Sequence, residues 1–253
     1  MSNIKIHFII SPQDYAKDFA LRCIEKWGQT NIFQASYIVS LGGDGTALFA
    51  QQAALSTYLS SGKIIPIYSI DCSNSKYHRG VLTNHRVKRP DEIEESILNA
   101  KRTKVYPLKA DCELLEPQNG WPYQTYYGFN EIAIKTSDFQ MTHLEVKFDD
   151  IKTKTIEGDG CILATPIGKG GYYYNLGGKD FKEGHLGFQT IASRQVINRI
   201  IPDNSSVAVK VISHHRAPSV MRDCNLVSEP ILSAIIRKSN VPLIVLRDRQ
   251  RGE

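Results

Sequence analysis

A short glycine-rich turn contains the residue types most suited to chemistry in this chain. Residues 42–46 read Gly-Gly-Asp-Gly-Thr and directly follow an apolar run at residues 37–40. Glycine tolerates positive φ and lets a ligand approach the backbone closely. Residues 47–59 predict a helix, so its free N–H groups and the positive end of its dipole would face the turn. A phosphate bound there, with the Asp44 carboxylate beside it as a base, would be equipped for phosphoryl transfer.

The elements that must position this turn alternate between strand and helix patterns over residues 1–102. Apolar runs at 4–10, 37–41 and 64–70 predict strands. Ser11 as N-cap and Gly28 as terminator delimit a helix between them, and Gly62 would end the helix after the turn. A third helix is predicted from Pro90 to about residue 101, with acids in its first turn and bases in its last. The alternation predicts an α/β domain, a parallel sheet with flanking helices.

The texture changes after residue 102. Short β-rich runs at 104–115, 123–135, 143–148, 154–163, 206–212 and 231–236 have no convincing helices between them. They predict a C-terminal β-rich, mostly antiparallel domain over residues 103–240. Residues 241–253 are a C-terminal segment that could return to the first domain, and Arg247 and the residues after it predict a solvated tail. A cleft between the domains is the expected ligand site.

Bulk composition narrows the class of protein. The chain has 253 residues, 42% of them hydrophobic, and a formal net charge of +5. That charge falls short of the bias of a dedicated nucleic-acid binder. The five cysteines are odd in number and contain no Cys-x-x-Cys pair, so neither a disulfide framework nor a zinc site is indicated. No apolar run is long enough for a signal peptide or a membrane span, which predicts a cytoplasmic protein without a membrane partner. The modest net charge predicts no nucleic-acid partner.

Two further motifs follow the glycine turn. Residues 128–132 read Gly-Phe-Asn-Glu-Ile. Residues 157–178 contain Glu-Gly-Asp-Gly-Cys, then Thr-Pro-Ile-Gly, a tyrosine at 172 and a final Gly-Gly pair. The three elements in this order resemble the NAD kinase family over most of the chain. The segment 80–83 is similar to a family segment, and residues 190–192 and Asp223 are weaker landmarks.

The resemblance implies an NAD kinase, which transfers a phosphoryl group from ATP or polyphosphate to the adenosine ribose 2′-hydroxyl of NAD and forms NADP. It implies Asp44 as the base, a divalent cation such as Mg²⁺, and a homo-oligomer, either a dimer or a tetramer. It assigns the adenosine end of NAD to Asn130 and Glu131, and the nicotinamide side to Asp159. No metal-ligating side chain is predicted. The binding residues implied are Gly42, Gly43, Gly45, Thr46, Asn130, Glu131, Asp159, Gly170, Gly171, Tyr172, Asn175 and Ala192.

The chain also departs from the family pattern. Lys169-Gly170-Gly171 replaces a hydroxyl-bearing sequence, and Glu157 occupies a position that is often basic, for which Lys169 is a candidate substitute. A basic run at residues 76–89 suits either donor phosphates or a solvated loop. Two alternatives therefore stay open: a dinucleotide-binding regulator without turnover, and a lipid kinase, because enzymes related to diacylglycerol kinase share the turn. The phosphate donor and the choice between NAD and NADH also stay open.

Overall fold

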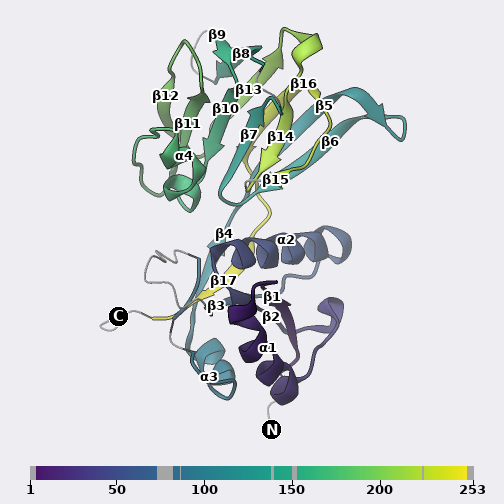
Figure 1. Ribbon diagram of the computed structural model, residues 1–253, viewed down its shortest axis with the longest axis vertical. Coiled ribbons are helices and arrows are strands. Elements are labelled where there is room, and N and C mark those ends of the chain that lie inside the picture. Colours follow the sequence, from purple (N-terminus) through teal and green to yellow (C-terminus); the bar gives the residue numbers. More distant parts are fainter. Residues whose placement is uncertain are drawn as a thin grey trace. The chain divides into compact units, whose positions relative to one another are not determined.

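The computed structural model describes residues 4–72, 82–85, 87–137, 140–149, 153–223 and 225–249 (Figure 1). It divides into two compact units, the first comprising Met1–Val105 with Pro242–Glu253 and the second Tyr106–Val241. Half of the basic run, the family-like residues 80 and 81, and Cys224 lie outside the described residues.

The first unit is an α/β fold, a five-stranded sheet with helices on both faces (Figure 1). The strand order is β1-β2-β3-β17-β4, in which the first four strands are parallel and β4 is antiparallel to β17. Helices α1 and α3 share one hydrophobic core with the sheet, and α2 covers the opposite face. Its elements are β1 (Ile6–Ile10), α1 (Asp14–Trp27), β2 (Tyr37–Gly42), α2 (Asp44–Ser61), β3 (Ile67–Asp71), α3 (Glu92–Asn99), β4 (Lys101–Val105) and β17 (Leu243–Arg247).

The glycine signals predict the helix ends correctly, but the starts differ. Gly28 and Gly62 cap α1 and α2 with φ values of 71° and 72°, a conformation that glycine adopts without steric cost. The prediction of Ser11 as N-cap is wrong, because its backbone N–H donates to the carbonyl of Leu41 at 2.9 Å and α1 begins only after Gln13. Helix α3 has the predicted acids in its first turn but no base in its last, because the chain enters β4 at Lys101.

The second unit consists of two six-stranded antiparallel sheets around a common hydrophobic core. The orders are β12-β11-β10-β7-β14-β15 and β6-β5-β16-β13-β8-β9. The strands are β5 (Leu108–Gln118), β6 (Trp121–Gly128), β7 (Glu131–Lys135), β8 (Thr142–Phe148), β9 (Lys154–Gly158), β10 (Gly160–Ala164), β11 (His185–Ile191), β12 (Asn198–Pro202), β13 (Ser206–Val211), β14 (Ser219–Arg222), β15 (Asn225–Leu226) and β16 (Ile231–Lys238). One short helix, α4 (Tyr172–Asn175), precedes β11.

Two of the segments predicted as single β-rich runs each form two strands in the structure. The run 123–135 is broken between β6 and β7 at Phe129 and Asn130, and the run 154–163 is broken between β9 and β10 at Asp159. Both breaks fall on predicted motifs, so the functional candidates lie at strand ends. Among the described residues, no helix is long and apolar enough to span a membrane.

Candidate active site

The glycine turn joins the carboxyl end of β2 to α2. Gly42 is in parallel register with Asp71, and its carbonyl accepts from the N–H of Cys72 at 3.2 Å. A Cβ on Gly42 would lie 2.9 Å from the Cβ atoms of Ser11 and Thr46, too close for any other residue without a backbone shift. Glycine is therefore required at position 42 by the close approach of its neighbours.

Asp44 is the first residue of α2, and its carboxylate reaches away from its own helix. Gly43 is the N-cap and provides no side-chain cap. The Oδ1 atom of Asp44 accepts from the backbone N–H of Leu82 at 3.1 Å and from the Thr83 hydroxyl at 3.5 Å. A helix does not use the N–H groups of its own first turn, so the start of this 18-residue helix offers donors to an anion next to a carboxylate.

The carboxyl ends of the parallel strands bring further charged residues to the same edge. Asp71 ends β3, and its Oδ2 lies 3.3 Å from His85 Nδ1. Arg247 ends β17 and is half-buried. Burial lowers the pKa of the Arg247 guanidinium, and the charge of Asp44 opposes that effect. The prediction that the solvated tail begins at Arg247 is therefore wrong, because Arg247 is the last residue of β17. The apolar run directly before it is the sequence feature that indicates a strand there.

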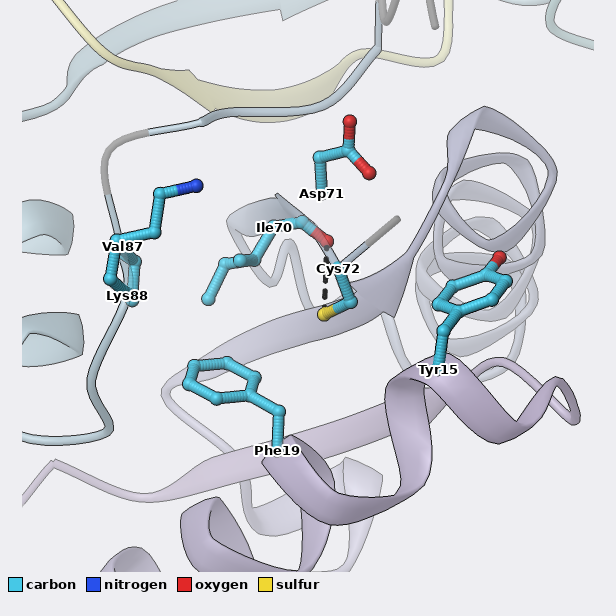
Figure 2. Close-up of a pocket in the computed structure, with 7 residues that line it drawn as sticks. All are labelled: Tyr15, Phe19, Ile70, Asp71, Cys72, Val87 and Lys88. Atoms are coloured by element: carbon cyan, nitrogen blue, oxygen red, sulfur yellow. Dashed lines mark hydrogen bonds between the residues drawn. The ribbon is translucent and has the colours of Figure 1, made fainter. Parts of the chain in front are cut away.

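A small cavity lies beside Asp71 (Figure 2), with a volume of about 150 Å³. That is below the roughly 300–1,000 Å³ of ligand pockets. Its walls include Tyr15 and Phe19 of α1 and the thiol of Cys72, which lies 3.7 Å from the carbonyl oxygen of Ile70. Burial, followed by the charge of Asp71, raises the pKa of Cys72 to about 11. This cavity holds a protonated thiol and is too small for a nucleotide.

In the second unit, the peptide groups at Asn130 are held from both sides. Asp223 Oδ1 accepts from the N–H groups of Phe129 and Asn130 at 2.8 and 2.7 Å. The Thr165 hydroxyl donates to the Phe129 carbonyl at 2.7 Å, and the Thr165 N–H donates to the Asn130 carbonyl at 2.9 Å. The side-chain Oδ1 of Asn130 is buried and has no hydrogen-bond partner among the described residues. The backbone is thus fixed while an amide oxygen is left for a ligand.

The loop after Thr165 lies against the Asn130–Glu131 pair. A Cβ on Gly168 would overlap the Asn130 backbone, and a Cβ on Gly171 would lie 3.5 Å from Glu131 Oε2. Glu131 begins β7 and is 2% exposed. Gly170, Tyr172 and Asn175 follow on this loop and on α4, so the structure brings these predicted residues to one end of β7. Gly170 has open space around its Cα.

The side chains that flank this loop have different roles. Tyr173 is fully buried and meets the Phe181 ring edge-on at 5.7 Å, whereas Tyr174 is 64% exposed and Tyr172 half-buried. The Lys169 ammonium lies 2.7 Å from Asp180 Oδ1 and donates to the Phe181 carbonyl. Lys169, the candidate substitute for a phosphate contact, is therefore bonded locally in this structure.

Asp159 and Ala192 lie at the other end of the same sheet. Asp159 N–H donates to the Ile191 carbonyl at 3.0 Å, and Ala192 follows with a φ of 43°. In the β7–β10 ladder Ala164 pairs with Glu131 and Gly160 with Lys135. The four-residue offset separates these two groups by about 14 Å at the usual rise of a strand. The predicted residues of this unit thus form two groups, one at each end of β10.

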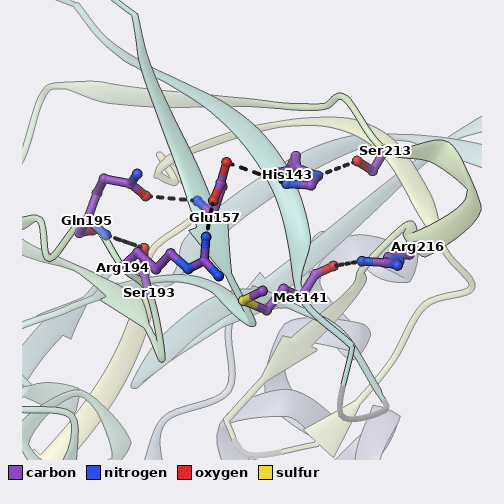
Figure 3. A network of polar contacts seen from close by, with 8 residues as sticks. All are labelled: Met141, His143, Glu157, Ser193, Arg194, Gln195, Ser213 and Arg216. Carbon is purple, nitrogen blue, oxygen red and sulfur yellow. Dashed lines mark hydrogen bonds and ion pairs between the residues drawn. The ribbon is translucent and has the colours of Figure 1, made fainter.

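Glu157, the departure from the family pattern, belongs to a surface polar network (Figure 3). Its two carboxylate oxygens lie 3.7 Å from His143 Nε2 and 3.4 Å from an Arg194 guanidinium nitrogen. The Glu157 N–H donates to the Gln195 side chain, and His143 Nδ1 is 2.6 Å from the Ser213 hydroxyl. A cation therefore lies beside the acidic residue, contributed by the loop after β11.

The fold is shared with two solved kinases. A yeast NADH kinase complexed with NADH has a TM-score of 0.78 at 13% identity, and the match covers 98% of this chain and 84% of that chain. An NAD kinase from Archaeoglobus fulgidus in complex with ATP has a TM-score of 0.72 at 18% identity, covering 98% and 95%. This chain therefore has the fold of these NAD(H) kinases.

Similarity in sequence extends over nearly the whole chain. It is 26% identical over 251 residues to an NAD kinase from Zymomonas mobilis, covering 96% of this chain and 92% of that protein. It is 23% identical over 252 residues to an NAD kinase from Xylella fastidiosa, covering 96% and 89%. No protein-family model matches the chain. The near-full-length similarity and the shared fold together support the NAD kinase family for this chain.

Proposed function

We propose that the protein is an NAD kinase that transfers the terminal phosphoryl group of ATP to the 2′-hydroxyl of the adenosine ribose of NAD, forming NADP. The observation that carries the proposal is the carboxylate of Asp44 at the start of α2, held by Leu82 beside the first-turn N–H groups. Similarity to curated NAD kinases supports the same reaction. No observation on the described residues favours a lipid kinase or a regulator without turnover.

In this proposal Asp44 removes the proton from the 2′-hydroxyl as the oxygen bonds to phosphorus. A positioned base contributes about 10²–10⁴ to such a rate. Gly42 lets the turn pack closely against Ser11 and Thr46, and Gly43 would let the phosphates approach the backbone. The N–H groups of Gly45 and Thr46 belong to the first helical turn, where an anion is stabilised. The turn therefore aligns the phosphate and accepts the proton.

Asn130 and Glu131 would bind the adenosine end of NAD. The buried Oδ1 of Asn130 can accept from a ribose hydroxyl or an amino group, and a carboxylate such as Glu131 accepts from hydroxyls. Gly170, Gly171, Tyr172 and Asn175 on the adjoining loop and α4 would line the same end of the sheet. Asp159 and Ala192, about 14 Å away by strand rise, suit the other half of an extended dinucleotide.

A divalent cation is part of the proposal. Mg²⁺ is usually held by substrate phosphates with one or two carboxylates. No group of three His, Cys, Asp or Glu side chains in the described part of the chain could hold a metal ion alone. Mg²⁺ would arrive with ATP, held mainly by its phosphates, and would neutralise phosphate charge there. Polyphosphate as an alternative donor to ATP, a cytoplasmic location and a dimeric or tetrameric homo-oligomer complete the proposal.

The experiment is an NADP-formation assay with purified protein, NAD, Mg²⁺ and either ATP or polyphosphate. Wild-type protein should form NADP, and Asp44→Asn should lose at least about 100-fold in rate because the base is removed. Asp18→Asn on the exposed face of α1 removes a similar charge and should keep wild-type activity. A fully active Asp44→Asn variant would contradict the assignment of the base. Wild-type protein that binds NAD calorimetrically but forms no NADP would favour the regulator.

A further inference from the structure

Arg247 stands out as a cation that the sequence motifs do not include. It ends β17, whose neighbour Leu246 is in parallel register with Tyr68 of β3. Parallel strands present their carboxyl ends at one edge, which in open α/β sheets is the ligand edge. Arg247 therefore lies at the same edge of the first unit as Gly42 and the Asp44 turn.

Within the described part of the chain, no counter-ion neutralises the guanidinium of Arg247 directly. The side chain is half-buried, and no described residue makes a hydrogen bond or an ion pair with it. Asp44 is nevertheless near enough for its charge to interact with the guanidinium. A partly desolvated arginine stays protonated, and burying a charge is costly unless a partner compensates. Such a group is suited to receive an anion.

The segment 82–85 fixes both Asp44 and Arg247. The Asn84 amide donates to the Leu246 carbonyl at 3.1 Å and accepts from the Asp248 N–H at 2.9 Å, so it bonds the residues on both sides of Arg247. Asn84 is buried, and the Tyr68 hydroxyl donates to Asp248 at 2.7 Å. Leu82 of the same segment donates to Asp44. One short piece of chain thus sets the spacing between a carboxylate and a guanidinium.

We propose that Arg247 binds the phosphoryl group being transferred, as the cationic partner of Asp44 at the carboxyl edge of the sheet. This inference rests on the proposed function. Asp44 takes the proton of the ribose 2′-hydroxyl, and the 2′-oxygen bonds to the γ-phosphorus of ATP. The bond from that phosphorus to the bridging oxygen breaks, and its electron pair stays on ADP. The anion nearest Asp44 is therefore the γ-phosphoryl group. The planar fork of arginine can hold two of its oxygens.

The test compares Arg247→Gln, Arg247→Lys and the control Arg249→Gln, whose exposed side chain lies two residues further along. Kinetics give kcat and separate KM values for ATP and NAD, and calorimetry measures binding of inorganic tripolyphosphate to the resting protein. We expect Arg247→Gln to raise KM for ATP at least tenfold, weaken tripolyphosphate binding similarly and leave KM for NAD unchanged. Arg247→Lys should be intermediate because it keeps a point charge, and Arg249→Gln should resemble wild type.

Two results would overturn the inference. Unchanged KM for ATP and tripolyphosphate binding in a folded Arg247→Gln protein would mean that the guanidinium touches no donor phosphate. A rise confined to KM for NAD would place the guanidinium on the dinucleotide instead. Absence of NADP formation by wild-type protein would count against the proposed function alone, since tripolyphosphate binding tests Arg247 without turnover. Circular dichroism of Arg247→Gln and Arg247→Lys shows whether loss of binding follows loss of the guanidinium or loss of the fold.

Discussion

At the scale of single residues, Asp223 shows how a distant side chain prepares a binding group. Its carboxylate accepts two backbone N–H groups at Phe129 and Asn130, and its own N–H donates to the Glu131 carbonyl at 3.2 Å. Its φ of 48° is in the left-handed region, which is uncommon for a residue other than glycine. The three hydrogen bonds hold the turn that presents Asn130 and compensate for the cost of this backbone conformation.

Asp223→Asn should therefore weaken NAD binding more than ATP binding. The amide keeps the size but loses the charge that strengthens both hydrogen bonds, each worth about 1.5–3 kcal/mol with a charged partner. We expect KM for NAD to rise several-fold with KM for ATP unchanged, and the urea midpoint to fall. Asp149→Asn is a matched control, because Asp149 also accepts a backbone N–H, from Ser206 at 2.7 Å. Equal effects of the two variants on KM for NAD would contradict this role.

The thiol of Cys161 gives a pH prediction. Burial raises its pKa from an ordinary value of 9.0 to about 12. The folded protein therefore keeps this proton over a range in which the unfolded chain loses it, so the contribution to stability is full below pH 9 and is lost between about pH 9 and 12. At one pH unit above the unfolded pKa the loss is about 1.4 kcal/mol.

Urea unfolding of wild type and Cys161→Ala at pH 8 and at pH 10 measures this term. The substitution leaves a small cavity and lowers stability at both pH values, but it should flatten the dependence on pH by about 1.4 kcal/mol. Lysines and tyrosines that titrate in the same range do so in both proteins. The difference in pH dependence between wild type and Cys161→Ala therefore isolates the effect of this thiol. An identical pH dependence in the two proteins would contradict the raised pKa.

Site residues that the sequence predicts belong to short local motifs, whereas those that it misses depend on interactions with residues far away along the chain. Asp44, Asn130 and Glu131 belong to short motifs whose chemistry is visible locally. Arg247 depends on an electrostatic interaction with Asp44, about two hundred positions earlier, and nothing in its neighbours beyond the apolar run indicates that. Asp223 was only a weak landmark, because its bonds to the Asn130 turn exist only after β14 pairs with β7.

At the scale of elements, the strand breaks are what the sequence pattern misses. The run 123–135 is rich in β-forming residues on both sides of Phe129 and Asn130, so the pattern predicts one strand. In the structure Gly128 has no room for a Cβ because the Glu131 carbonyl approaches it, and the chain turns there. Helix ends were predictable because glycine is needed locally, whereas the start of α1 depends on a bond from Ser11 to another strand.

Gly168→Ala tests how the loop after Thr165 is seated. A Cβ there would overlap the Asn130 backbone, so the loop or the turn must move. Such overpacking usually costs about 1–3 kcal/mol, and a displaced Asn130 should also raise KM for NAD. Gly170→Ala, in the same loop with open space at its Cα, should leave the urea midpoint unchanged. Equal midpoints for the two alanine variants would show that the loop adapts without disturbing Asn130.

At the scale of the whole molecule, the first unit is assembled from two distant parts of the chain. β17 lies between β3 and β4 in its sheet, although more than a hundred residues separate it from β4. The second unit is one continuous piece, Tyr106–Val241, and its ends are tied by the Ser239 N–H donating to the Pro107 carbonyl at 2.7 Å. The two units should therefore differ in their dependence on the C-terminal residues.

A chain that ends at Val241 should keep a folded second unit and lose the first. Without β17, strands β3 and β4 have unpaired edges, and the apolar side chains of Leu243, Val245 and Leu246 are missing from the core. Hydrogen exchange read by mass spectrometry should show protection in β5 to β16 and rapid exchange in β1 to β3. A chain that ends at Arg249 keeps β17 and should retain protection in both units. Protected β1 to β3 amides in the shorter chain would show that the first sheet is stable without its inserted strand.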